Sequence, residues 1–111
     1  IDLGHLSRDP SVGEAYDADP LVYQKATTRL ALESFAAQDR IQHEIEAITT
    51  PTLVIHGSED TLVPPSASAP LAKVESVDRK VYPGLRHELH NEPEQDQVLS
   101  EVAAWLDATL A

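Results

Sequence analysis

The sequence predicts an α/β protein with a parallel sheet, and three observations lead to this fold class. Residues 52–56 form a short apolar run between Pro51 and Gly57, which is typical of a strand buried on both faces of a parallel sheet. Residues 79–82 predict a second strand. A segment with helical character follows each strand, so the order strand, helix, strand, helix indicates a right-handed parallel unit.

Two helices are predicted in the N-terminal half. Asp9 precedes Pro10, and an N-cap aspartate with proline in the first turn predicts a short helix over about residues 10–17. Residues 25–48 contain neither Gly nor Pro, and apolar side chains recur there at spacings of three and four, which predicts an amphipathic helix. The stripe comprises Leu30, Ser34, Ala37, Ile41, Ile45 and Ile48.

Two more helical segments follow the strands. Residues 66–77 have moderate helical character, and Pro70 fits a helix there only in its first turn. The run Asn91-Glu92-Pro93-Glu94 has the form of a capping box, with Asn91 as the N-cap and Glu94 at the third position. It predicts a terminal helix over about residues 92–110.

Two parallel strands are too few for an independent domain. Such a sheet leaves its edges unpaired and one face uncovered, and the predicted helix over residues 25–48 also lacks a partner. We therefore expect the chain to be part of a larger sheet, as a fragment, as one piece of a nicked protein or as one subunit of an assembly.

Composition excludes several classes of function. The chain has 111 residues, enough for one domain at most, and a net charge of -11, which argues against binding to nucleic acid or to anionic lipid. It has no cysteine, so disulfides, thiolate zinc sites and a cysteine nucleophile are excluded within it. No apolar run is long enough to span a bilayer.

An acid and a histidine follow the two predicted strands. Asp60 lies three residues after Gly57, and His87 lies three residues after Gly84. Because the loops after parallel strands open at the same edge of a sheet, the two side chains can meet there. An acid that orients a histidine forms two thirds of a nucleophilic triad, and the order acid then histidine is that of hydrolases with a nucleophile elbow.

The third member of a triad is missing from the chain. No Gly-x-Ser-x-Gly elbow occurs, and the serines lack a strand–turn–helix context. Ser58 is too close to Asp60 to be the attacking group. No loop that would form an oxyanion hole is recognisable either. The nucleophile is therefore expected outside these residues.

Neighbouring charged residues permit other interpretations. His87-Glu88-Leu89-His90 has the wrong spacing for a zinc motif, because ligands on a helix stand four residues apart, so no metal site is predicted. His56 ends a buried strand and is interpreted as structural. Glu88 and Glu92 either raise the basicity of His87 or are solvated, and the sequence leaves both alternatives open.

The motifs in the C-terminal half resemble a known family. PTLVIHGSEDTLVPP, followed by KVYPGLRHELHNEPEQDQVLSEVAAWL, resembles the C-terminal part of α/β-hydrolase-fold serine hydrolases of the monoacylglycerol lipase and lysophospholipase group. The HG-x-x-D loop of that group carries the triad acid and the Y-x-G-x-x-H-E loop carries the triad histidine. The resemblance thus implies catalytic roles for Asp60 and His87.

The resemblance extends to the N-terminal part. LSRDP and DPLVY resemble the end of the cap segment of bacterial members. Residues 1–48 would then be part of the cap or lid and its return helix, and residues 49–111 would be the C-terminal part of the core, with the last two parallel strands and flanking helices. Residues assigned on this basis to a hydrophobic acyl tunnel are Leu3, Leu6, Val12, Tyr16, Leu62 and Val63.

The family implies hydrolysis of single-chain glycerol esters through an acyl-enzyme, without metal or cofactor. The expected partners are an N-terminal remainder carrying the elbow serine and oxyanion hole, and a small lipid ester. The expected location is cytoplasmic or peripheral to a membrane, with transient membrane contact through the cap. On this interpretation the chain alone is inactive.

Two alternatives remain open. The chain could be a non-catalytic interaction module whose exposed sheet edge recruits a partner strand. It could also belong to an α/β hydrolase with a different substrate, such as a haloalkane, a peroxide or an amide.

Overall fold

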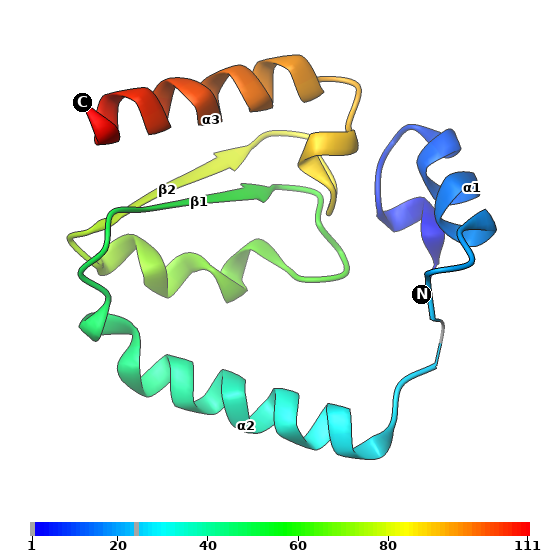
Figure 1. Ribbon diagram of the computed structural model, residues 1–111, viewed down its shortest axis with the longest axis horizontal. Coiled ribbons are helices and arrows are strands. Elements are labelled where there is room, and N and C mark those ends of the chain that lie inside the picture. Colours follow the sequence, from blue (N-terminus) through cyan, green and yellow to red (C-terminus); the bar gives the residue numbers. More distant parts are fainter. Residues whose placement is uncertain (1, 24) are drawn as a thin grey trace.

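The computed structural model describes residues 2–23 and 25–111; Ile1 and Gln24, both within the predicted cap segment 1–48, lie outside the described residues. The helices and strands, in chain order, are α1 (Pro10–Ala18), α2 (Thr28–Glu44), β1 (Thr52–Gly57), β2 (Val77–Tyr82) and α3 (Gln95–Leu110) (Figure 1). Short 3-10 helices occur at Leu3–His5, Ile45–Ala47, Pro65–Ala67, Ala69–Lys73 and Leu89–Asn91.

The two strands pair in parallel, as predicted. Thr52 lies opposite Val77, and the register continues to Gly57 opposite Tyr82. β2 begins two residues earlier than the sequence indicated, at Val77 rather than Arg79. Because both strands end at the same edge of the sheet, the loops that follow them lie next to each other.

Helix α3 covers one face of the sheet (Figure 1). The Tyr82 hydroxyl donates a hydrogen bond to Glu101 over 2.6 Å, and the Trp105 indole N–H donates to Asp78 over 2.7 Å. Lys80 also pairs with Glu101. The buried core on this face consists of Tyr82, Leu85, Leu89 and Val98, with Ile55 packed against them.

The crossover between the strands covers the other face, and it differs from the predicted helix over residues 66–77. It forms two short 3-10 helices, and Pro70 lies in the first turn of the second. Arg79 donates to the carbonyl of Pro65 over 2.6 Å and to the hydroxyl of Ser68 over 3.0 Å. The missing N–H of Pro70 and these contacts of Arg79, one to a backbone carbonyl and one to a hydroxyl, favour short turns over one regular helix.

The predicted capping box is wrong, and α3 begins at Gln95 rather than near residue 92. The side-chain amide of Asn91 donates to Glu88 over 2.7 Å instead of capping the helix, and the Glu94 side chain makes no cap hydrogen bond. The reason is that Glu92 is buried and accepts hydrogen bonds from other segments, so the chain around it turns before the helix starts.

Helix α2 forms within the predicted range 25–48, but it begins after the N-cap Thr27 and ends at Glu44, where a 3-10 turn follows, and its apolar side chains are not covered. Leu30, Leu32 and Phe35 are 59%, 70% and 65% exposed. Within residues 2–23 and 25–111, β1 also has one unpaired edge. These are the features expected of part of a larger sheet, which stays a prediction. None of the described helices is both long and apolar enough to cross a membrane.

The loop after β2 packs directly on the end of β1. The backbone N–H of Ser58 donates to the carbonyl of Tyr82, and that of Glu59 donates to the carbonyl of Leu85, both over 2.9 Å. A Cβ on Gly57 would lie 2.3 Å from the Leu85 oxygen and 2.2 Å from the Arg86 oxygen. Only a residue without a side chain allows this approach.

We predict that Gly57→Ala destabilises the protein by about 3 kcal/mol or more, at the upper end of the usual cost of overpacking, because backbone must move to admit the methyl group. The measurement is the free energy of unfolding in urea. Gly84→Ala is the matched control: its φ of +78° carries strain, but no atom lies within 4 Å of the added Cβ, so about 1–2 kcal/mol is expected. Equal losses in the two variants would contradict the packing argument.

Burial, and then the hydrogen bond to Glu101, raise the pKa of Tyr82 to about 12. The folded state therefore favours the neutral phenol, and the associated stability is present below pH ~10 and is lost as pH rises from there through about 12. We predict that Glu101→Gln lowers this pKa while leaving it above the ordinary value, because burial remains. Tyrosinate absorbance measures the titration, and Tyr82→Phe identifies its contribution. An unchanged midpoint in Glu101→Gln would count against the hydrogen bond.

Candidate active site

The loop after β1 fixes the side chain of Asp60. Asp60 is buried, with 6% of its surface exposed. One carboxylate oxygen, Oδ1, accepts hydrogen bonds from the backbone N–H groups of Leu62 and Val63 over 3.0 and 2.9 Å. This turn around the aspartate is local and leaves the second oxygen, Oδ2, directed toward the neighbouring loop.

The loop after β2 brings His87 to that second oxygen. Gly84, with a positive φ, turns the chain after the strand. The Nδ1 atom of His87 then lies 2.9 Å from Oδ2 of Asp60, and its side chain is 36% exposed. The acid and histidine that the sequence singled out are thus in direct contact, with the acid buried and the histidine facing solvent on one side.

The contacts also determine the protonation of the pair. Burial of Asp60 favours its neutral form, but hydrogen bonds from Val63, His87 and Leu62 and the charge of His87 outweigh it, and the pKa lies below its usual value. An ionised carboxylate can only accept a hydrogen bond, so Nδ1 of His87 carries the proton. In the neutral imidazole, Nε2 is then unprotonated and able to accept a proton.

A second histidine supports the acid from within the fold. His56 is buried, and its Nε2 lies 2.8 Å from the carbonyl of Val63 and 3.3 Å from Oδ2 of Asp60. Its Nδ1 lies 2.7 Å from the hydroxyl of Ser68. Because a carbonyl only accepts, Nε2 carries the proton, and His56 ties the acid loop to the crossover segment. The structural interpretation of His56 agrees with these contacts, but its contact with Asp60 was not predicted.

The two glutamates near His87 have different environments. Glu92 is 1% exposed, so the alternative in which both residues are solvated is wrong for Glu92. Its carboxylate accepts hydrogen bonds from Arg8 and from the backbone of Arg86. Glu88 accepts from Asn91 instead. Sequence reasoning did not foresee any role for Arg8, and no local pattern pairs it with a residue 84 positions away.

The residues predicted to line an acyl tunnel are spread over several surfaces. Val12 and Tyr16 of α1 border a hollow that Glu88 and Asn91 complete. Leu3 borders another hollow on α1, and Leu6 is buried. Leu62 and Val63 lie in the acid loop itself, where their N–H groups hold Asp60. Their role in binding substrate stays a prediction.

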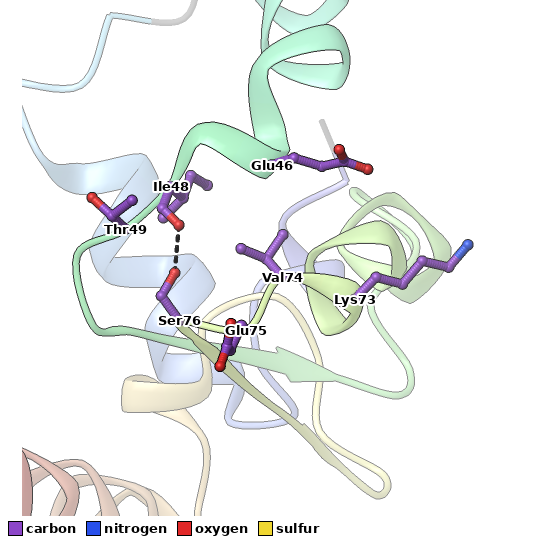
Figure 2. Close-up of a pocket in the computed structure, with 7 residues that line it drawn as sticks. All are labelled: Glu46, Ile48, Thr49, Lys73, Val74, Glu75 and Ser76. Atoms are coloured by element: carbon purple, nitrogen blue, oxygen red, sulfur yellow. Dashed lines mark hydrogen bonds between the residues drawn. The ribbon is translucent and has the colours of Figure 1, made fainter.

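Another hollow lies at the opposite end of the strands (Figure 2). It is formed by residues that precede β1 and β2, and the hydroxyl of Ser76 donates to the carbonyl of Ile48 across it over 2.6 Å. It contains neither Asp60 nor His87. In the described ranges, no group of three or more His, Asp or Glu residues could hold a metal ion.

Comparison with known proteins identifies the family. The family model for serine aminopeptidase, S33, matches residues 1–94. A monoacylglycerol lipase of Mycolicibacterium smegmatis is 41% identical over 110 residues, which are 96% of this chain and 39% of that protein. A non-heme haloperoxidase of Rhodococcus erythropolis is 40% identical over 58 residues, 50% of this chain and 21% of that protein.

A solved structure gives the same answer for the fold. The crystal structure of Paleococcus ferrophilus monoacylglycerol lipase superposes with a TM-score of 0.92 at 28% identity, over 98% of this chain and 44% of that one. The chain thus spans about two fifths of the length of the lipases that it matches. The predicted resemblance and fold class are confirmed: the chain belongs to the serine aminopeptidase S33 family and has the fold of part of an α/β hydrolase of the monoacylglycerol lipase type.

Proposed function

We propose that this chain supplies the acid, Asp60, and the histidine, His87, of a Ser-His-Asp triad in a carboxylic-ester hydrolase. The observation that carries the proposal is the 2.9 Å contact between Nδ1 of His87 and Oδ2 of Asp60 at the ends of adjacent parallel strands. The nucleophilic serine and the oxyanion hole belong to an N-terminal part of the same hydrolase, and the 111 residues alone are inactive.

In this mechanism His87 moves the proton and Asp60 holds the imidazole. Nε2 of His87 removes the proton of the serine as it attacks the ester carbonyl, and the imidazolium that forms is stabilised by the ionised carboxylate of Asp60. His87 then returns the proton to the leaving alcohol, and the acyl-enzyme remains. A water molecule activated by the same nitrogen releases the acid.

The substrate class is proposed from the relatives. Two of them are named monoacylglycerol lipases and match nearly the whole chain. We infer that the substrate is a small single-chain glycerol ester, and that residues 1–48 belong to the cap or lid and its return helix. The hollow between α1 and the His87 loop would then contribute to the acyl site through Val12 and Tyr16.

We predict that His87→Ala and Asp60→Asn each lower kcat/KM for short-chain ester hydrolysis by ~10⁴-fold in the complete hydrolase, because loss of one triad member disables the proton transfer. The measurement is kcat/KM, obtained from initial rates per active site at several concentrations of a short-chain 1-monoacylglycerol. His90→Ala is the matched control, since His90 is an exposed histidine on the same loop. Rates within a few-fold of the unaltered enzyme for His87→Ala would refute the triad.

A second candidate function keeps the triad but uses hydrogen peroxide instead of water as the substrate that accepts the acyl group. The 40% identity with a haloperoxidase over half of the chain favours a hydrolase whose acyl-enzyme transfers its acyl group to hydrogen peroxide, which frees the serine and releases a peracid. The peracid would then oxidise a halide ion to hypohalite and return to the carboxylic acid. The two candidates differ in the acceptor that releases the acyl group. Peroxide-dependent halogenation in the presence of a carboxylic acid, at a rate exceeding monoacylglycerol hydrolysis, would favour the second.

A further inference from the structure

The carboxylate of Glu92 is buried beside the His87 loop and has no part in the proton transfer proposed above. Its side chain has no exposed surface. Oε2 accepts from the backbone N–H of Arg8 over 3.2 Å and from its Nε over 3.0 Å. Oε1 accepts from the backbone N–H of Arg86 over 2.5 Å. Three donors therefore hold a single side chain, two from Arg8, 84 positions away, and one from Arg86 in the preceding loop.

The hydrogen bond between Glu92 and the Arg86 N–H matters for His87 because Arg86 directly precedes it in the chain. This hydrogen bond to the Arg86 N–H fixes the Leu85–Arg86 peptide, the unit immediately before the Arg86–His87 peptide that leads to the His87 Cα. The same peptide is held from the other side too, because its carbonyl, that of Leu85, accepts from the backbone N–H of Glu59 and lies against Gly57 at the end of β1. The direction of the imidazole toward Asp60 thus depends on a backbone clamped between Glu92 and β1.

The N-terminal segment Gly4–Arg8 closes this arrangement. Besides the Arg8 contacts, the carbonyl of Leu6 accepts from the backbone of Glu88 over 2.8 Å, and the hydroxyl of Ser7 donates to the carbonyl of Asn91 over 2.8 Å. The guanidinium of Arg86 donates to the carbonyls of Gly4 and Ser7. The Glu92 carboxylate bonds to this segment through Arg8 and to the His87 loop through the backbone N–H of Arg86.

The charge of Glu92 makes the clamp selective for a carboxylate. All its contacts are N–H donors, and one comes from a guanidinium, so an acceptor with two ionised oxygens fits while an amide would present its own N–H groups to them. Only the Glu92 end of the ion pair is fully buried, so loss of Arg8 would leave the Glu92 carboxylate without its compensating charge. Arg8 also pairs with Glu94, which is 42% exposed.

We propose that Glu92 is a positioning residue for His87: its buried carboxylate, anchored by Arg8, fixes the Leu85–Arg86 peptide just before His87 and thereby orients the imidazole toward Asp60. The proposal rests on the proposed function for the reaction it affects. It also assigns the segment Gly4–Arg8 a role in orienting the histidine, because Arg8 is the anchor.

The test compares Glu92→Gln with Glu94→Gln in the complete hydrolase. Both variants remove one carboxylate from Arg8, but only the first also removes an ionised acceptor from Arg86. We expect Glu92→Gln to lower kcat by roughly 10–100-fold with KM within about twofold, since a misplacement of ~1 Å can cost ~10²-fold in rate. Glu94→Gln is expected to leave both constants unchanged. Titration of the nucleophile by an organophosphonate normalises rates to folded active sites.

A second measurement is independent of ester turnover. We expect the Nδ1 proton of His87, in its hydrogen bond to Asp60, to give a low-field NMR resonance that is identified by its loss in His87→Ala. It should move or broaden in Glu92→Gln and stay in place in Glu94→Gln. Arg8→Lys keeps the positive charge but loses the Nε donor, so it provides a milder variant if Glu92→Gln fails to fold, and a several-fold fall in kcat is expected.

The outcomes separate this inference from the proposed function. If His87→Ala abolishes activity while Glu92→Gln and Arg8→Lys retain full kcat per titrated site and an unmoved resonance, Glu92 is structural only and the inference is wrong. If His87→Ala itself retains activity, the proposed function fails, and the resonance in Glu92→Gln still decides whether Glu92 orients the imidazole.

Discussion

The contact between the end of β1 and the loop after β2 is made largely of backbone, and the geometry of the Asp60–His87 pair depends on it. Hydrogen bonds from Ser58 and Glu59 join the two loops, and the absence of a side chain at Gly57 lets the carbonyl oxygens of the second loop approach. Backbone contacts of this kind are insensitive to side-chain rotamers. The two loops therefore behave as one rigid unit, and the surface they share carries the acid and the histidine in direct contact.

Two buried carboxylates organise that surface, and each has donors for both of its oxygens. Asp60 takes two backbone N–H groups on one oxygen and His87 on the other. Glu92 takes Arg8 on one oxygen and the Arg86 backbone on the other. A buried charge is tolerated only when it is paired and hydrogen-bonded, so both groups hold their surroundings in one arrangement. Every buried polar side-chain atom in the described ranges has a partner.

Local signals in the sequence were sufficient for the strands, for α1 and α2, and for the meeting of Asp60 with His87, because strand order and loop position follow from short-range patterns. They were insufficient for Glu92. Its place before Pro93 resembles a helix start, and the competing contact comes from Arg8, a residue 84 positions away. Pro70 is similar: the composition around it favours a helix, and the contacts of Arg79 from the neighbouring strand select short turns. Long-range partners decided each of these cases, and no single-sequence pattern records them.

The separation in sequence between Gly4–Arg8 and the His87 loop has a consequence for the order of folding. Hydrogen bonds between them join residues 79 to 86 positions apart, whereas the pairing of β1 with β2 needs a far shorter loop. Closing a long loop costs more chain entropy than closing a short one, and contacts of high sequence separation form slowly. We therefore expect the sheet and its two loops to form first, with the histidine loop only loosely oriented, and the docking of the N-terminal segment to complete it late. The helices and strands would therefore form before His87 takes up its final orientation toward Asp60.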